Sequence, residues 1–198
     1  MKHTLAFLIA LATFIAGGAA AGGNEWDSLP AAKKTKAGLY MSPREAAEQM
    51  QTAGDKTLFL DVRTRAEISV LGMPTLADAN VPFVELVEPY AWDDTRNTYR
   101  TAPNNDFAVE VARRLAEKKL GKGDTVILIC RSGDRTAKAV DLLTGLGYAR
   151  VYSVPEGFEG DVAKDGDKAG QRVVNGWKNA GMPWTYKLDK KKMYGMGS

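Results

Sequence analysis

The sequence predicts an α/β fold with a mainly parallel central sheet flanked by helices. Residues 57–62 and 125–129 are continuous apolar runs, as expected of strands that are buried on both faces. Residues 106–119 and 136–146 instead carry apolar side chains at helical spacing. Short apolar strands that alternate with helices are typical of one α/β domain.

A capping motif predicts the first helix, over residues 42–53. Ser42 is suited to the N-cap, Pro43 to the first helical position, and Glu45 completes a capping box. Gly54 follows the last helical residue and is expected to end the helix.

The remaining elements are predicted from shorter patterns. We expect strands over residues 81–86 and 150–154 and a last short helix over 172–179. The segment 87–105 is rich in aromatic and acidic residues, which indicates a surface loop or a wall of the active site. With the C-terminal segment 176–186, it is a candidate for the entrance to a site.

The first 21 residues have the pattern of a cleavable signal peptide. Lys2 supplies a positive charge, residues 5–15 an apolar run, and residues 19–21 are three alanines at the expected cleavage region. The apolar run is shorter than the roughly 20 residues that span a bilayer, which argues against a permanent anchor. We therefore expect a periplasmic protein with no membrane span after cleavage.

The rest of the chain divides into three parts. Residues 22–38 are small and polar and predict a flexible arm, and residues 39–186 form the expected domain. Residues 187–198 contain several lysines and predict a solvated basic tail. The net charge of the whole sequence is only +3, which gives no reason to expect nucleic acid as a partner.

The sequence contains one cysteine, Cys130, and one histidine, His3. A single cysteine cannot form an internal disulfide, so in an exported protein it is a buried hydrophobe, a link to another chain, or a working thiol that a partner keeps reduced. Because His3 lies in the predicted signal peptide, catalysis by a Cys-His or Ser-His pair is excluded. We expect no metal site and no cofactor.

Cys130 opens a loop between the strand 125–129 and a helix that we expect to start at Thr136. In a tight loop, backbone N–H groups can converge on one atom, and Gly133 permits the backbone angles that this requires. The start of the helix adds further N–H groups, and Arg131 and Arg135 add positive charge that favours a thiolate. The alternative is that Cys130 ends a buried strand and the loop is an ordinary connection.

The length of the loop separates two chemistries. Cysteine-dependent phosphatases use the spacing C-x5-R, which would require an arginine at Thr136. Here the arginine is Arg135, which gives C-x4-R. The shorter loop encloses a smaller pocket, suited to one sulfur atom rather than to a phosphoryl group.

The sequence resembles the rhodanese family over residues 39–186. The resemblance lies in LDVR at 60–63, Glu67, CRSGDRT at 130–136 and GYARVYSVPEGFEG at 147–160. It implies a rhodanese-like fold and an exported, single-domain sulfurtransferase. Cys130 would take sulfane sulfur from a donor such as thiosulfate, become a persulfide, and pass the outer sulfur to a thiophilic acceptor such as cyanide or a thiol.

The resemblance also implies roles for individual residues. Asp61 and Arg63 would support the site by holding neighbouring loops. Met73 stands where the family motif has a histidine, which lies outside the catalytic loop. The residues that would bind the anionic donor and surround the persulfide are Arg131, Ser132, Gly133, Asp134, Arg135 and Thr136.

Two other functions remain open. The chain could be a non-catalytic sulfur-delivery or anion-binding module for an exported partner protein, or a phosphatase or arsenate-reducing enzyme, for which the loop is one residue short. As a sulfurtransferase it would meet a small inorganic or organic sulfur donor, a thiol or cyanide acceptor, and an exported partner or reductant.

Overall fold

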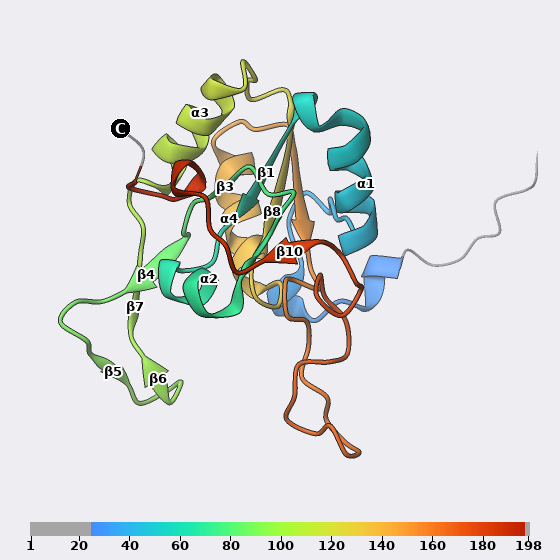
Figure 1. Cartoon of the computed structure of the whole chain (residues 1–198), viewed down its shortest axis with the longest axis vertical. Helices are drawn as coiled ribbons and strands as arrows, with labels where there is room; N and C mark the ends of the chain where they lie inside the picture. Colours follow the sequence, from blue (N-terminus) through green and yellow to red (C-terminus); the bar gives the residue numbers. More distant parts are fainter. Residues whose placement is uncertain (1–24, 197–198) are drawn as a thin grey trace, which may run out of the picture.

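The computed structural model describes residues 25–196, so the predicted signal peptide lies outside the described residues. Its centre is a parallel sheet with the strand order β3-β1-β8-β9 (Figure 1). The α/β fold with a mainly parallel sheet is therefore confirmed. The strands of this sheet are β3 (Ala79–Asn80), β1 (Thr57–Asp61), β8 (Thr125–Ile129) and β9 (Arg150–Val154).

Helices cover both faces of this sheet, with α1 on one side and α3 and α4 on the other (Figure 1). Successive side chains of β1 point to opposite faces: Leu58 and Leu60 pack with α3 and α4, whereas Phe59 packs with α1, α2 and Trp177. Within residues 25–196, no helix has the length and apolar character needed to cross a membrane. The helices are α1 (Pro43–Ala53), α2 (Arg65–Leu71), α3 (Phe107–Glu117) and α4 (Asp134–Gly145), with a short 3-10 turn at Gly54–Lys56.

The predicted strand over 81–86 is wrong in its bounds, because only its second half is a strand, β4 (Val84–Leu86). β3 ends before it, and Pro82, between the two strands, has no N–H to donate to a ladder. β4 instead starts a β-ribbon that projects from the body of the domain, where the sequence predicts a loop (Figure 1). The other strands of the ribbon are β7 (Thr101–Pro103), β5 (Trp92–Asp93) and β6 (Thr98–Tyr99).

The predicted helix over 172–179 is also wrong, because these residues form bends and turns, and Arg172 makes an isolated β-bridge with Val162. Gly176 has a φ of +99°, and a Cβ at this residue would lie 2.5 Å from the backbone nitrogen of Gly160. This close contact between two backbones holds the segment in a non-helical path. Nearby, β2 (Met73–Pro74) pairs with β10 (Trp184–Thr185), and Met73 is buried in the core beside α1.

The N-terminal segment 25–38 packs on the domain, so the expectation of a flexible arm is wrong for these residues. The Lys33 side chain is only 7% exposed, and its Nζ lies 2.6 Å and 2.8 Å from the two carboxylate oxygens of Asp161. Residues 39–41 continue this packing along the edge of β9, where the N–H of Met41 donates to the carbonyl of Ser153. The segment includes the 3-10 turns Glu25–Ser28 and Ala31–Lys33.

The basic C-terminal segment is likewise held, as far as residue 196. Met193 is buried, and the guanidinium of Arg114 in α3 donates to the carbonyl of Lys191 at 3.0 Å. The ammonium of Lys192, in the 3-10 turn Lys190–Lys192, donates to the carbonyl of Ala77 at 2.7 Å. A solvated tail is therefore the wrong description of residues 187–196, because this segment exchanges hydrogen bonds with the domain.

Replacing Lys33 tests whether the N-terminal segment contributes to stability. We expect Lys33→Ala to lower the free energy of unfolding by about 1 kcal/mol, because a mostly buried ammonium loses its carboxylate. Lys36→Ala is the control, since Lys36 bonds to Asp141 through its backbone N–H, and should change stability by less than about 0.5 kcal/mol. Urea unfolding measures both; equal effects would contradict the packing of this segment.

Candidate functional site

The site lies where the carboxyl ends of three neighbouring strands meet. The register of the sheet pairs Asp61 with Ile129, and Ile129 with Val154. Cys130, which follows β8, therefore lies between the residue that follows β1 and Pro155, which follows β9. Ligand sites of open α/β sheets lie at this edge.

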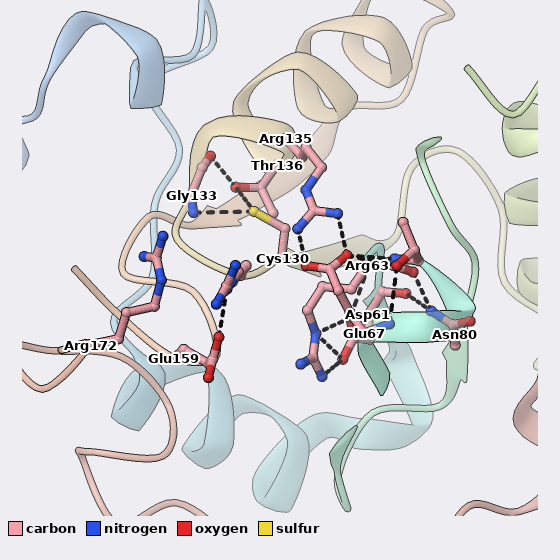
Figure 2. A network of polar contacts seen from close by, with 12 residues as sticks. Asp61, Arg63, Glu67, Asn80, Cys130, Gly133, Arg135, Thr136, Glu159 and Arg172 are labelled. Carbon is pink, nitrogen blue, oxygen red and sulfur yellow. Dashed lines mark hydrogen bonds and ion pairs between the residues drawn. The ribbon is translucent and has the colours of Figure 1, made fainter. Parts of the chain in front are cut away.

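Cys130 is buried, with 1% of its surface exposed, and its sulfur faces the loop that it opens (Figure 2). The N–H of Gly133 points at the sulfur, with a distance of 3.1 Å from N to Sγ. Helix α4 starts at Asp134, two residues earlier than predicted, with Gly133 as its N-cap. The N–H groups in the first turn of this helix have no intrahelical carbonyl as acceptor, and they lie directly after the residue whose N–H points at the sulfur.

The loop is fixed by direct contact with the segment that follows β9. The carbonyl of Cys130 accepts a hydrogen bond from the N–H of Phe158 at 2.8 Å, and that of Arg131 accepts from the N–H of Glu159 at 3.1 Å. Gly133 has a φ of +102°, and a Cβ there would lie 2.1 Å from the carbonyl oxygen of Pro155. No other residue type can be accommodated at this contact without moving one of the two backbones.

Thr136 closes the loop from inside the helix (Figure 2). Its hydroxyl donates to the carbonyl of Gly133 at 2.6 Å and accepts from the hydroxyl of Ser153 in β9 at 2.8 Å. The distance from Thr136 Oγ1 to Cys130 Sγ is 4.0 Å. Thr136 thus connects the loop, the helix and the neighbouring strand close to the sulfur.

The two arginines of the loop are both engaged by carboxylates. The Nε of Arg131, whose side chain is 44% exposed, lies 2.6 Å from Glu159. Arg135 makes two hydrogen bonds of 2.6 Å to the carboxylate of Glu67 in α2 (Figure 2). Their positive charges, which are expected from the sequence to act on the sulfur and on an anionic donor, are therefore shared with Glu159 and Glu67.

The ion pair with Arg135 changes the titration of Glu67. Burial acts to raise the pKa of this carboxyl, but the hydrogen bonds and charge of Arg135, together with hydrogen bonds from Thr64, lower the pKa to about 2. The pKa of Arg135 is raised: burial opposes this, and it is outweighed by Glu67 and, to a smaller extent, by the charges of Cys130 and Asp61. Arg135 is thus electrostatically linked to the sulfur site.

Asp61 and Arg63 form a fully buried ion pair behind the loop. Arg63 Nε lies 2.9 Å from one carboxylate oxygen of Asp61, and Nη2 donates to the carbonyl of Gly72 at 2.7 Å. The guanidinium lies over the ring of Phe158, 3.9 Å from its centroid. Asn80 completes the network by donating to the carbonyls of Asp61 and Arg63, a contact that no motif in the sequence indicates (Figure 2).

Two cavities lie on different parts of the loop surface. One of about 380 Å³ is bounded by Arg131, Arg135 and the β-ribbon, including Tyr99. Another of about 750 Å³ is bounded by Ser132, the N-terminal segment and residues 161–174. Within residues 25–196, no cluster of three or more histidine, cysteine or acidic side chains is arranged to hold a metal ion.

The aromatic residues considered for the entrance occupy different environments. Trp177 is fully buried in the core and donates to the carbonyl of Pro183, and Trp184 packs on Phe158. Trp92 is on the exposed ribbon, where it packs against Tyr99. Of the two segments expected to form entrance walls, the ribbon is therefore the one that borders a cavity at the loop.

Comparison with known proteins identifies relatives over most of the chain. The sequence model of the rhodanese-like domain family matches residues 42–164, which include the whole loop. An uncharacterized protein of Rickettsia conorii is 29% identical over 141 residues, covering 71% of this chain and 92% of that protein. The crystal structure of Rv0390 from M. tuberculosis is similar, with a TM-score of 0.55, 27% identity, and coverage of 74% of this chain and 96% of that one.

Replacing Gly133 tests the contact between the two backbones. We expect Gly133→Ala to lower the free energy of unfolding by about 3 kcal/mol or more. Alanine is strained at this positive φ, and its Cβ would also collide with the carbonyl of Pro155. Gly147→Ala is a matched control, since Gly147 has a φ of +88° but a Cβ there would have no atom within 4 Å. It should cost only about 1–2 kcal/mol. Similar losses in the two variants would show that the contact is not tight.

The Glu67–Arg135 pair predicts a pH dependence of stability. Because the pKa of Glu67 is lowered in the folded protein from 4.5 to about 2, the pair stabilises the fold fully above about pH 4.5. This contribution is lost as the pH falls toward 2. We expect Glu67→Gln to cost about 2 kcal/mol at neutral pH and much less near pH 3. Unfolding at both pH values measures the difference, and a loss that is independent of pH would contradict it.

Proposed function

Because the chain belongs to the rhodanese-like domain family, we propose that it is a sulfurtransferase that carries sulfane sulfur on Cys130. Membership of this family supports a sulfurtransferase-type function at the family level. The observation that carries the proposal for this chain is the placement of Cys130 Sγ, 3.1 Å from the backbone nitrogen of Gly133 and beside the first turn of α4. An anionic sulfur is favoured at such a position by N–H groups and by the helix dipole.

The proposed first half-reaction loads the cysteine. The Cys130 thiolate attacks the outer sulfur of a donor such as thiosulfate, and the sulfur–sulfur bond of the donor breaks. Sulfite leaves with the electron pair of that bond, and Cys130 becomes a persulfide. This exchange needs no proton to be removed from the donor, which is consistent with a site built without a histidine base.

The second half-reaction removes the outer sulfur from the Cys130 persulfide. A thiophilic acceptor, such as cyanide or a thiolate, attacks the outer sulfur of the persulfide, and the Cys130 thiolate is released as the leaving group. The backbone N–H groups of the loop suit both the thiolate and the persulfide anion, because both carry one negative charge on sulfur. Gly133 supplies one of these groups, 3.1 Å from the sulfur, and Thr136 holds the carbonyl of Gly133.

The roles of the two loop arginines are narrower in this proposal than the sequence suggests. Arg131 and Arg135 can contact the donor while they stay in their ion pairs with Glu159 and Glu67, so part of each charge is already neutralised. Their first role is to hold the walls of the site. The fully buried Asp61–Arg63 pair supports the loop from behind.

We also propose that the protein works after export, in the periplasm. The support is the signal-peptide pattern of residues 1–21. An exported thiol is exposed to oxidation, so a reductant or a persulfide-donating partner is part of the proposal. A non-catalytic sulfur-delivery or anion-binding module for an exported protein is the second candidate, and the burial of Cys130 favours its anion-binding form, which needs no access to the sulfur.

Intact mass measurement tests the proposed function. Reduced protein incubated with thiosulfate should gain the mass of one sulfur atom, and cyanide should remove it with formation of thiocyanate. Cys130→Ser should gain nothing, while Ser132→Ala, which keeps the thiol and the backbone N–H, should still be loaded. A wild-type protein that gains no sulfur from thiosulfate or from an organic persulfide would contradict the proposal.

A further inference from the structure

Arg172 differs from the two arginines of the loop in its partners. Its Nη1 donates to the carbonyl of Gly160 at 2.6 Å, and within residues 25–196 no carboxylate forms an ion pair with it. Arg131 and Arg135, in contrast, each have a carboxylate at 2.6 Å. Arg172 is half-buried and is therefore a partly desolvated cation whose charge is not compensated by a neighbouring acid.

Arg172 borders the larger of the two cavities beside the loop. It lies on the same side of the loop as Gly133, away from Arg135 (Figure 2). Ser132 of the loop borders the same cavity, so a ligand held by Arg172 lies next to the residue that precedes Gly133. The cavity exists because the N-terminal segment and residues 161–174, whose packing the sequence does not predict, both lie against the loop.

The size and charge of this cavity indicate the class of ligand. Its volume of about 750 Å³ is in the range of sites for organic ligands and exceeds the needs of a small ion such as thiosulfate. Its walls carry cations, Lys164 and Arg172, and also carboxylates, Asp134 and Asp165. Lys33 and Asp161 neutralise each other in the wall. A ligand with both carboxylate and ammonium groups complements such a surface.

We propose that this cavity binds an amino-acid or peptide persulfide as the sulfur donor, and that Arg172 pairs with its carboxylate and positions it. The inference rests on the proposed sulfurtransferase function. The Cys130 thiolate attacks the outer sulfur of the donor, the donor's sulfur–sulfur bond breaks, and the donor leaves as its thiolate with the electron pair. Arg172 lies beyond residues 42–164, the part of the chain that matches the family model.

Alkylation of Cys130 tests the charge of the cavity without any sulfur transfer. Iodoacetate and iodoacetamide have nearly the same shape but differ in charge, so the ratio of their rates reports the potential along the path to the sulfur. In Arg172→Gln we expect this ratio to fall about ten-fold. Iodoacetamide alone should react at the wild-type rate, which shows that the loop is intact, and Arg172→Lys should retain most of the ratio.

Lys168→Gln is the matched control, because Lys168 is an exposed lysine of the same segment that does not border the cavity. Its ratio should equal that of the wild type. If Arg172→Gln and Lys168→Gln have the same ratio, anions do not reach the sulfur past Arg172 and the proposal is overturned.

Donor kinetics then test the class of ligand. With glutathione persulfide as the donor, Arg172→Gln should raise KM about ten-fold with little change in kcat. With thiosulfate, the same variant should change KM less than about two-fold. Equal effects on the two donors would overturn the assignment of an organic ligand. If neither donor loads wild-type Cys130, the proposed function itself fails, whereas the alkylation ratio still tests the cavity.

Discussion

The backbone of the loop after β8 lies directly against the backbone of the segment after β9, and the position of the Cys130 sulfur depends on this contact. It forces glycine at residue 133, where a Cβ would meet the carbonyl of Pro155, and at residue 157, where it would lie 2.5 Å from the carbonyl oxygen of Arg131. With the loop fixed in this way, the N–H of Gly133 points at the sulfur and α4 begins immediately afterwards. The parallel register of β1, β8 and β9 brings the participating segments to one edge of the sheet.

The charge that the site can offer to an anion depends on which of its arginines already form ion pairs. Arg131 and Arg135 are held by Glu159 and Glu67, so their charges stabilise the walls as well as any bound anion. Stabilisation of a sulfur anion then falls mainly to backbone N–H groups, which need no reorganisation when the charge develops. Arg172, in contrast, has no carboxylate partner among the described residues and keeps its charge available for a ligand. In the function that we propose, the groups that hold the sulfur are thus separate from Arg172, which selects the donor.

Much of this arrangement could be predicted from the sequence because it depends on local patterns. The strand 125–129, the capping box at Ser42 and Glu45, and the helix 107–117 are each specified by a short run of residues. The pairing of Arg131 with Glu159 could not be predicted in this way, since it joins residues 28 positions apart through the turn after β9. The same is true of Lys33, whose polar surroundings suggest a flexible arm, although its partner Asp161 lies 128 positions away. Helix α2 was not predicted although it has a local signal, because Thr64 and Glu67 form a capping box.

We propose that the loop N–H groups hold the sulfur anion both as the thiolate and as the persulfide of Cys130. The most direct measurement is a crystal structure of the protein after treatment with thiosulfate. It should show an additional sulfur atom on Cys130, within hydrogen-bond distance of the N–H groups of the loop and of the first turn of α4, with the contact between Gly133 and Pro155 unchanged. An added sulfur that points away from these N–H groups, or a loop that unfolds to admit it, would contradict the claim.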